Sequence, residues 1–537
     1  MVLTAFVSLS AQAPPAALGR IAFPTSGSTA AQPLFVRGVL FLHSFEYDDA
    51  IEAFREAQKT DPGFALAYWG EALAYDQPLW QNESVDKARA VLARLAPTRA
   101  ARQAKVPTAR EKGYLDAVER LYGDGDSASR HRAYTDRMGE LHAQFPEDDE
   151  AAAFYALALL ATIPAGERNA EVSLKAGEIA SAILEKNPEH PGAAHYALHA
   201  FDDGEHAAMG LKAARIYARI APASSHARHM PSHVFLPLGM WGDAVASDEA
   251  AFAASVDLAK RKGLSAAQYD FHALSWLHYE YLQQGRFTKA RGAMAEVERA
   301  IAAPGGAGGA GRAGGAGGES HSHAESEIGK GFNPMSLKSE LASMKARLVV
   351  ESGDWAAMKG QGSFDNIDEL FALGAASVRL GDAGRAEAAI EHLGTAARTI
   401  PDRDAAEIAA IMGAEVDGML RLARGDRAGG LAALQRATSL EARRPKPVAR
   451  PYPLKPAAEL YGETLLAAGD PAGAVKQFQA ALARTPRRAA SLLGLARAAE
   501  KAGQHGAAVK AAKDFLAAWH LADAGRPELA EMRALAR

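Results

Sequence analysis

The chain has 537 residues, too many for one compact domain but not for a continuous solenoid, with a formal net charge of −4 and no cysteine. This charge gives no electrostatic footprint for nucleic acid or an acidic membrane, and the missing cysteines exclude disulfides, thiolate nucleophiles and cysteine-ligated zinc. Hydrophobic residues make up 48% of the chain but aromatic residues only 7%, so the excess is largely alanine, which suits closely packed helices.

The first residues have the pattern of an export signal. A short apolar run at 2–7 is followed by two small-x-small triplets, at 8–10 and 11–13, of the form that signal peptidase cleaves. No basic residue precedes Arg20, so the usual basic start is missing. We expect residues 1–29 to be a signal peptide and leader of a periplasmic or secreted protein, the alternative being an apolar tail on a cytoplasmic protein. No apolar stretch of about 18 residues follows, so we expect no membrane span.

Small and bulky residues recur with one spacing near both ends of the chain. They are Gly38, Phe41, Ala50, Phe54, Ala57 and Pro62 in the first unit, and Gly462, Leu465, Ala474, Phe478, Ala481 and Pro486 near the C-terminus. Small residues let two helices approach closely, bulky ones fill the space between units, and the proline ends the second helix by removing a backbone donor. This pattern resembles the tetratricopeptide repeat (TPR), a 34-residue helix–turn–helix unit.

The resemblance to TPR proteins covers nearly the whole chain and implies an all-α solenoid, a superhelix of helical hairpins. Residues 35–80 and 187–241 also resemble an uncharacterised bacterial group of such proteins, which implies no particular activity. The turn inside each hairpin recurs as Phe45-Glu46-Tyr47-Asp48-Asp49, Met240-Trp241-Gly242-Asp243, Gly285-Arg286-Phe287, Leu380-Gly381-Asp382, Arg424-Gly425-Asp426 and Ala468-Gly469-Asp470. A glycine that ends the first helix and an aspartate that caps the second explain most of these turns.

A glycine-rich segment at 304–332, which also contains two histidines, interrupts the helical pattern and predicts a flexible loop. It separates an N-terminal TPR block, 30–303, from a C-terminal TPR block, 333–537. The C-terminal block holds only three of the 17 histidines. Any histidine chemistry is therefore expected in the N-terminal block.

Two histidine pairs in the N-terminal block repeat at the TPR period. His195 and His199 form one H-x-x-x-H pair, and His229 and His233 form another 34 residues later. Residues three, four or seven positions apart share one face of a helix. Two such stripes result, one of His195, His199 and Asp202 and the other of His226, His229 and His233. Because equivalent helices line the concave surface of a solenoid side by side, we expect one patch of five imidazoles and a carboxylate in the groove.

Neutral imidazole is a good ligand for zinc, copper or iron, and an H-x-x-x-H pair on a helix brings two nitrogens onto one ion. Asp202 or Asp203 would add an oxygen ligand or orient a ring. Three alternatives need no metal: recognition of a peptide or another polar ligand, a polar ladder that fixes the register of the units, and plain helix surface. A kink at Pro231 either turns the rings inward or separates His233 from its stripe.

Four further residues are weaker candidates for a place in the ligand groove. They are His43, His272, Tyr196 and Tyr279. His43 lies near the end of the first helix, and His272 lies at the start of an expected helix at 269–283. Aromatic side chains in such a fold pack between units more often than they bind a ligand.

The sequence thus predicts an exported TPR scaffold whose concave groove binds a ligand, or a protein or peptide partner, with a histidine cluster that holds a transition metal. One alternative is a metal-dependent hydrolytic or oxidative enzyme that uses the same histidines. Another is a metal-free scaffold that binds a partner's peptide. Sequence motifs for nucleotide binding, serine hydrolysis and zincin proteases are absent, and no nucleic-acid partner is expected.

Overall fold

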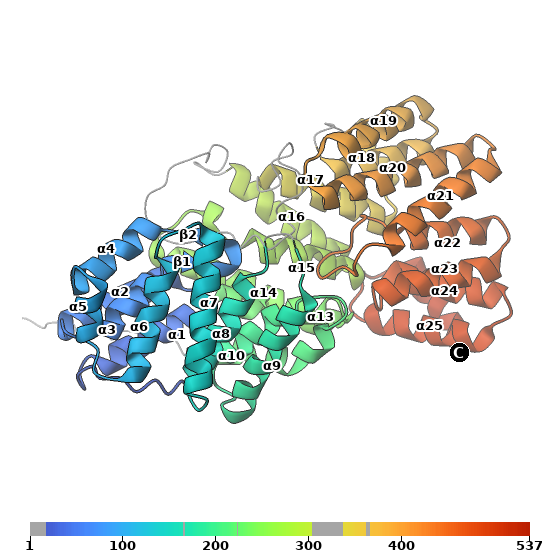
Figure 1. Cartoon of the computed structure of the whole chain (residues 1–537). Helices are drawn as coiled ribbons and strands as arrows, with labels where there is room; N and C mark the ends of the chain where they lie inside the picture. Colours follow the sequence, from blue (N-terminus) through green and yellow to red (C-terminus); the bar gives the residue numbers. More distant parts are fainter. Residues whose placement is uncertain (1–17, 165–166, 223, 303–336, 361–365) are drawn as a thin grey trace, which may run out of the picture.

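The computed structural model describes residues 18–164, 167–222, 224–302, 337–360 and 366–537. The predicted cleavage region at 1–13 and the predicted loop at 304–332 lie outside these residues, and the periplasmic or secreted location stays a prediction. The described part of the chain is almost entirely helical, and successive helices pack as hairpins (Figure 1). This architecture confirms the predicted all-α TPR solenoid. Within the described ranges, no helix has both the length and the apolar character needed to cross a membrane.

The helices follow one another along the chain with short turns. The N-terminal block contains α1 (Gln32–His43), α2 (Tyr47–Thr60), α3 (Ala65–Leu73), α4 (Val85–Leu95), α5 (Arg99–Ala104), α6 (Ala109–Leu121), α7 (Ser127–Gln144), α8 (Asp149–Ala161), α9 (Ala170–Lys186), α10 (Pro191–Ala200), α11 (Leu211–Ile220), α12 (Ser225–His229), α13 (Ser232–Phe235), α14 (Trp241–Lys262), α15 (Phe271–Gln283) and α16 (Phe287–Ala302). The C-terminal block contains α17 (Leu337–Ser352), α18 (Ile367–Leu380), α19 (Ala383–Thr399), α20 (Arg403–Ala423), α21 (Arg427–Ala442), α22 (Ala457–Ala467), α23 (Pro471–Arg484), α24 (Ala489–Lys501), α25 (His505–Ala518) and α26 (Pro527–Leu535).

Short elements of other kinds connect some of these helices. The 3-10 turns are η1 (Pro78–Trp80), η2 (Ala207–Gly210), η3 (Ala266–Gln268) and η5 (Trp355–Met358). Between α3 and α4, strand β1 (Asp76–Gln77) pairs antiparallel with β2 (Asn82–Glu83), with Asp76 opposite Glu83. This small hairpin lies beside the histidine-bearing part of the fold, because η1 within it packs on α8.

The spacing of small and bulky residues is explained by close helix packing. Phe54 of α2 is fully buried between glycines of the helices on either side. A Cβ added at Gly38 of α1 would lie 2.7 Å from the Phe54 ring, and one added at Gly70 of α3 would lie 2.4 Å from it. Phe478 of α23 fills the same position between glycines of α22 and α24. These glycines are needed because a larger side chain would collide with the aromatic ring.

Glycine ends the first helix of several hairpins in the left-handed conformation. Gly285, Gly381, Gly425 and Gly469 have φ angles of 68°, 79°, 85° and 85°. Glycine adopts this conformation without steric cost because it has no Cβ. In the first hairpin the same turn position is taken by Phe45, with a φ angle of 59°.

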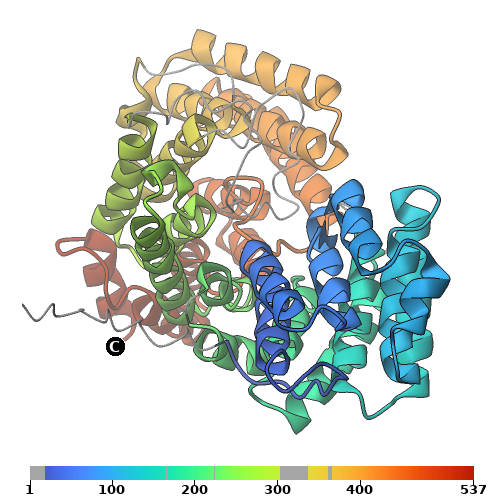
Figure 2. The ribbon, with the colours of Figure 1, turned by 90° about the vertical axis from the view of Figure 1, so that its left-hand side faces the viewer.

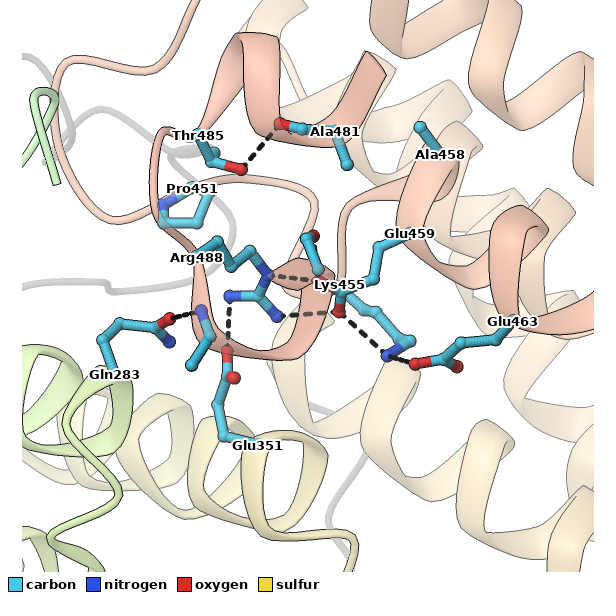
Figure 3. Close-up of polar contacts among 12 residues, drawn as sticks. Gln283, Glu351, Pro451, Lys455, Ala458, Glu459, Glu463, Ala481, Thr485 and Arg488 are labelled. Carbon is cyan, nitrogen blue, oxygen red and sulfur yellow. Dashed lines mark hydrogen bonds and ion pairs between the residues drawn. The ribbon is translucent and has the colours of Figure 1, made fainter. Parts of the chain in front are cut away.

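The superhelix turns so that the C-terminal hairpins pack against the middle of the chain (Figure 2). The indole nitrogen of Trp241 donates a hydrogen bond of 2.9 Å to the backbone oxygen of Arg487. The next residue, Arg488, is fully buried and contacts Glu459 of α22 and Glu351 of α17, each at 2.7 Å (Figure 3). This buried ion cluster joins helices of the C-terminal block that are distant in sequence, beside the contact of Trp241 with Arg487 that links the two blocks.

Short, broken helices position the histidines. The ring of His190 caps α10, since its Nδ1 accepts a hydrogen bond of 3.1 Å from the backbone N–H of Ala193. α12 is five residues long and ends at His229, and α13 begins at Ser232. Pro231 separates them because it has no N–H to donate to a continuing helix. Met230 and Pro231 nevertheless keep right-handed helical backbone angles, so the rings of His229 and His233 stay adjacent.

Candidate metal centres

Three histidine rings converge where α10 meets α12, and we call them set 1. His195 and His199 lie one turn apart on α10, and His226 reaches them from α12. The Nε2 atom of His195 is 2.8 Å from Nε2 of His226 and 3.0 Å from Nε2 of His199. One nitrogen from each ring lies within 4.8 Å of the others. Both His195 and His226 are buried.

The proton on the His195 ring is fixed by its second contact. Its Nδ1 lies 2.7 Å from the backbone oxygen of His43. Because a carbonyl oxygen only accepts hydrogen bonds, Nδ1 carries the proton, and in the neutral ring Nε2 presents a lone pair. Metal–nitrogen bonds of about 2.1 Å place neighbouring ligand nitrogens about 3.0 Å apart at a right angle and about 3.4 Å apart at a tetrahedral angle. The spacings of 2.8 and 3.0 Å in set 1 suit a metal site and equally suit N–H···N hydrogen bonds between the rings.

A second group of three histidines, set 2, lies one repeat further along the chain. His229 comes from α12, His233 from α13 and His272 from the start of α15. The Nε2 atoms of His229 and His233 are 3.0 Å apart, and the rings of His229 and His272 are 4.8 Å apart. One nitrogen from each ring again lies within 4.8 Å of the others. Set 2 therefore resembles set 1 in composition. Each set combines an H-x-x-x-H pair with a third ring from a later helix, α12 in set 1 and α15 in set 2.

Buried carboxyl groups orient the rings of set 2. The Nδ1 of His229 is 2.7 Å from Oδ1 of Asp248, and the Nδ1 of His233 is 2.9 Å from Oδ2 of Asp202. A carboxylate such as that of Asp202, which accepts from Nδ1 of His233, leaves the other ring nitrogen as the metal ligand and raises its basicity. Burial lowers the pKa of His229, so the ring stays neutral at physiological pH. Burial also raises the pKa values of Asp248 and of its neighbour Glu280.

The predicted single patch of five imidazoles is thus divided into two sets of three, and His272 completes the second. His226 and His229 both lie on α12, before Pro231, yet belong to different sets, whereas His229 and His233 stay together across the proline with their Nε2 atoms 3.0 Å apart. Asp202, predicted as a metal ligand, belongs to neither set of ligand atoms and instead orients the ring of His233. Asp203 accepts from His206 Nδ1 at 2.7 Å and stabilises the following turn.

An aromatic ring covers each set. The ring centre of Phe45 is 4.2 Å from that of His195 and 5.8 Å from those of His199 and His226. Trp276 covers set 2 in the same way, with ring distances of 5.1, 4.3 and 5.6 Å to its three histidines. Sequence reasoning treated Phe45 only as part of a turn, although the missing glycine at that position was a signal that could have marked it.

The structure places the remaining groove candidates in the core. His43 is buried, and its Nε2 lies 2.8 Å from Glu150, while its Nδ1 lies 2.8 Å from the hydroxyl of Tyr196. His190 contacts the other oxygen of Glu150 at 3.3 Å. Burial opposes ionisation of Glu150, but the two histidines outweigh it and hold its pKa at about 2. The buried contacts of His43 with Glu150 and Tyr196 hold His43 in place, and its backbone oxygen in turn orients the ring of His195 in set 1.

Tyr279, the last groove candidate, lies instead where the two blocks meet. Its hydroxyl is 3.3 Å from Nη1 of Arg488, and its ring packs edge-on against Trp241 at 5.9 Å. Burial raises its pKa to about 12. Sequence reasoning also missed a fourth polar group, Asp76, Glu83 and His131, which the short β hairpin brings to α7.

No protein-family model matches the sequence, and no curated protein matches it either. Among solved structures, a human IFIT1 dimer with m7Gppp-AAAA shares 12% identity, with 93% of this chain and 91% of that chain covered and a TM-score of 0.32. A monomeric IFIT1 mutant with m7Gppp-AAAA shares 13% identity, with 85% and 90% covered and a TM-score of 0.36. Yeast Tom70 shares 11% identity, with 89% and 96% covered and a TM-score of 0.30. The chain is similar to these helical repeat proteins in fold class alone.

Proposed function

We propose that this TPR protein binds two transition-metal ions, one at each histidine set, and presents them to a ligand. The observation that carries the proposal is the convergence of three imidazole nitrogens in each set, with outer Nδ1 contacts that leave Nε2 as the ligand atom in His195 and His233. The H-x-x-x-H pairs of the two sets are 34 residues apart, and four of the six rings are buried, so these are not ordinary surface histidines.

The ligand atoms point to the class of metal. Each set offers three imidazole nitrogens, without thiolate, and this donor type suits zinc, copper and iron. Among divalent ions, an all-nitrogen site binds copper more tightly than zinc. Three protein ligands on a four-coordinate ion leave one position open, as in catalytic rather than structural zinc sites.

That open position also favours a second candidate function, a metal-dependent hydrolytic or oxidative enzyme. The position would hold water or a substrate atom, and the buried surroundings would strengthen the pull of the ion on it. A scaffold that binds the side chain of a partner protein would use the same position. Both functions require metal, so metal binding is the first property to measure.

The test is the metal content of untagged protein by elemental mass spectrometry. We expect about two equivalents of metal in the wild type, and about one equivalent in His199→Ala and in His233→Ala, because each variant loses one ligand of one set. His520→Ala is the control, since that exposed histidine belongs to neither set. Circular dichroism establishes that each variant is folded. Protein that stays metal-free after incubation with zinc, copper and iron salts would overturn the proposal and leave the metal-free peptide scaffold.

A further inference from the structure

Phe45 has an unfavourable backbone conformation at a turn where the other hairpins use glycine. The N–H of Glu46 donates to the oxygen of Phe41 at 3.0 Å, and the N–H of Arg286 donates to the oxygen of Tyr281 at 2.9 Å, so Phe45 and Gly285 are equivalent. The φ angle of Phe45 is 59°. A residue with a Cβ pays about 1–2 kcal/mol for this left-handed conformation, and such strain clusters at functional sites. The chain retains a phenylalanine where glycine would fit better.

The side chain of Phe45 lies between set 1 and a cavity. One side of its ring contacts the three histidines of set 1, at 4.2 Å for His195. The same side chain lines a cavity of about 20 Å³ together with Leu42, Leu73, Phe154 and Leu157. Phe45 is therefore a side chain common to the cavity lining and to the surroundings of the first candidate metal site.

The cavity suits a small apolar molecule better than water. Its lining is mainly aliphatic and aromatic, and its polar end is formed by Asp76 and His131. These two groups bind each other, with the His131 Nε2 atom 3.2 Å from the nearer carboxylate oxygen. A cavity needs about 10–15 Å³ to hold one water, and that water needs two to four polar partners, whereas apolar cavities stay dry and take up xenon or hydrocarbons. The cavity volume of about 20 Å³ therefore has room for one small molecule.

We propose that this cavity binds a small uncharged apolar molecule of the size of dioxygen and delivers it past Phe45 to the open position of the ion at set 1. The delivery step rests on the proposed metal binding, whereas the occupancy of the cavity does not. A metal at set 1 would then receive its ligand from inside the fold, and the aromatic ring would control the passage. Phe45 acts here as a positioning residue, not as a ligand of the metal.

Occupancy is tested with xenon and metal-free protein, by ¹²⁹Xe NMR. The valine of Ala158→Val enters the cavity, because Ala158 of α8 is one of its lining residues. Ala152→Val makes the same change on α8 outside the lining. We expect saturable xenon binding in the wild type and Ala152→Val, and at least a tenfold loss in Ala158→Val. Leu157→Ala enlarges the cavity and should strengthen binding, which keeps the test decisive if Ala158→Val does not fold.

Delivery is tested on protein loaded with Cu(I), by stopped-flow measurement of its oxidation in oxygenated buffer. The His233→Ala background leaves set 1 as the reporting site. We expect oxidation at least fivefold slower in Ala158→Val than in Ala152→Val. Oxidation should be faster in Phe45→Gly than in its parent, because the ring of Phe45 is removed. Equal xenon binding or equal oxidation rates in the two valine variants would overturn this inference without affecting metal binding. Xenon binding in a protein that takes up no metal would instead overturn the proposed function.

Discussion

Replacement of Asp202 should weaken metal binding at set 2 and leave set 1 unchanged. The carboxylate is 15% exposed and accepts from a His233 ring that is 1% exposed, at 2.9 Å. A hydrogen bond to a charged group contributes about 1.5–3 kcal/mol, and loss of such an outer partner typically costs about 10–100-fold in metal affinity, or about 1.4–2.7 kcal/mol. Asp202→Asn keeps an oxygen acceptor and should lose about tenfold, while Asp202→Ala should approach 100-fold.

The assay isolates each site in turn by isothermal titration calorimetry with zinc. In the His199→Ala background only set 2 is complete, and the Asp202 variants are compared there with Asp203→Ala, a neighbour that contacts His206 and neither set. In the His233→Ala background only set 1 is complete, and Asp202→Ala should bind as the parent does. Equal affinity of the Asp202→Ala and Asp203→Ala variants at set 2 would refute the reasoning. An equal loss at both sets would also refute it, because it would show a general disturbance of the fold.

Three further predictions concern stability. Arg488→Met leaves Glu351 buried without its partner and should lower the free energy of unfolding by about 3–5 kcal/mol in urea titrations; a variant as stable as the wild type would contradict this role. Phe45→Gly relieves about 1–2 kcal/mol of backbone strain but removes a buried ring, which costs about 3–5 kcal/mol. The free energy of unfolding in urea titrations should therefore fall by about 2 kcal/mol. A stabilised variant would contradict the packing role of the ring. Glu150 has a pKa of about 2 in the fold against an ordinary 4.5. The ionised carboxylate therefore contributes about 3 kcal/mol to the free energy of unfolding above pH 4.5, and this contribution is lost as pH falls towards 2. Below pH 4.5 the stability of Glu150→Gln should decrease less steeply with falling pH than that of the wild type. Equal pH dependence of the two proteins in this range would contradict an ionised Glu150.

The repeat fold was predictable because its signals are local. The contact of Phe54 with Gly38 is made within one hairpin, and the sequence spacing alone specifies it. The closure of the superhelix is different, since Trp241 of α14 donates to the backbone oxygen of Arg487, 246 residues later. No periodicity along the chain reports a contact of that kind. The TPR pattern therefore predicted the hairpins but not the way in which the C-terminal block packs on the N-terminal one.

The candidate sites were predicted in part for the same reason. His195 and His199 share a face of one helix, so their proximity follows from spacing. Membership of the two sets does not, because His226 and His229 of one short helix go to different sets and His272 arrives from α15. The outer partners were beyond sequence reasoning as well: the backbone oxygen that orients His195 belongs to His43, on α1. The spacing of residues on one helix face predicts which side chains are candidate ligands. Which of them meet at one site depends on the tertiary structure.

Two features tie the sets to each other. α12 is little more than one turn long and carries a ligand of each set, His226 and His229, three positions apart. Asp202 lies three residues after His199, a member of set 1, yet it orients the ring of His233 in set 2. A shift of α12 would therefore displace one ligand of each site at once, whereas α10 and α15 each carry ligands of a single set. α12 is therefore the element through which the two candidate sites are coupled.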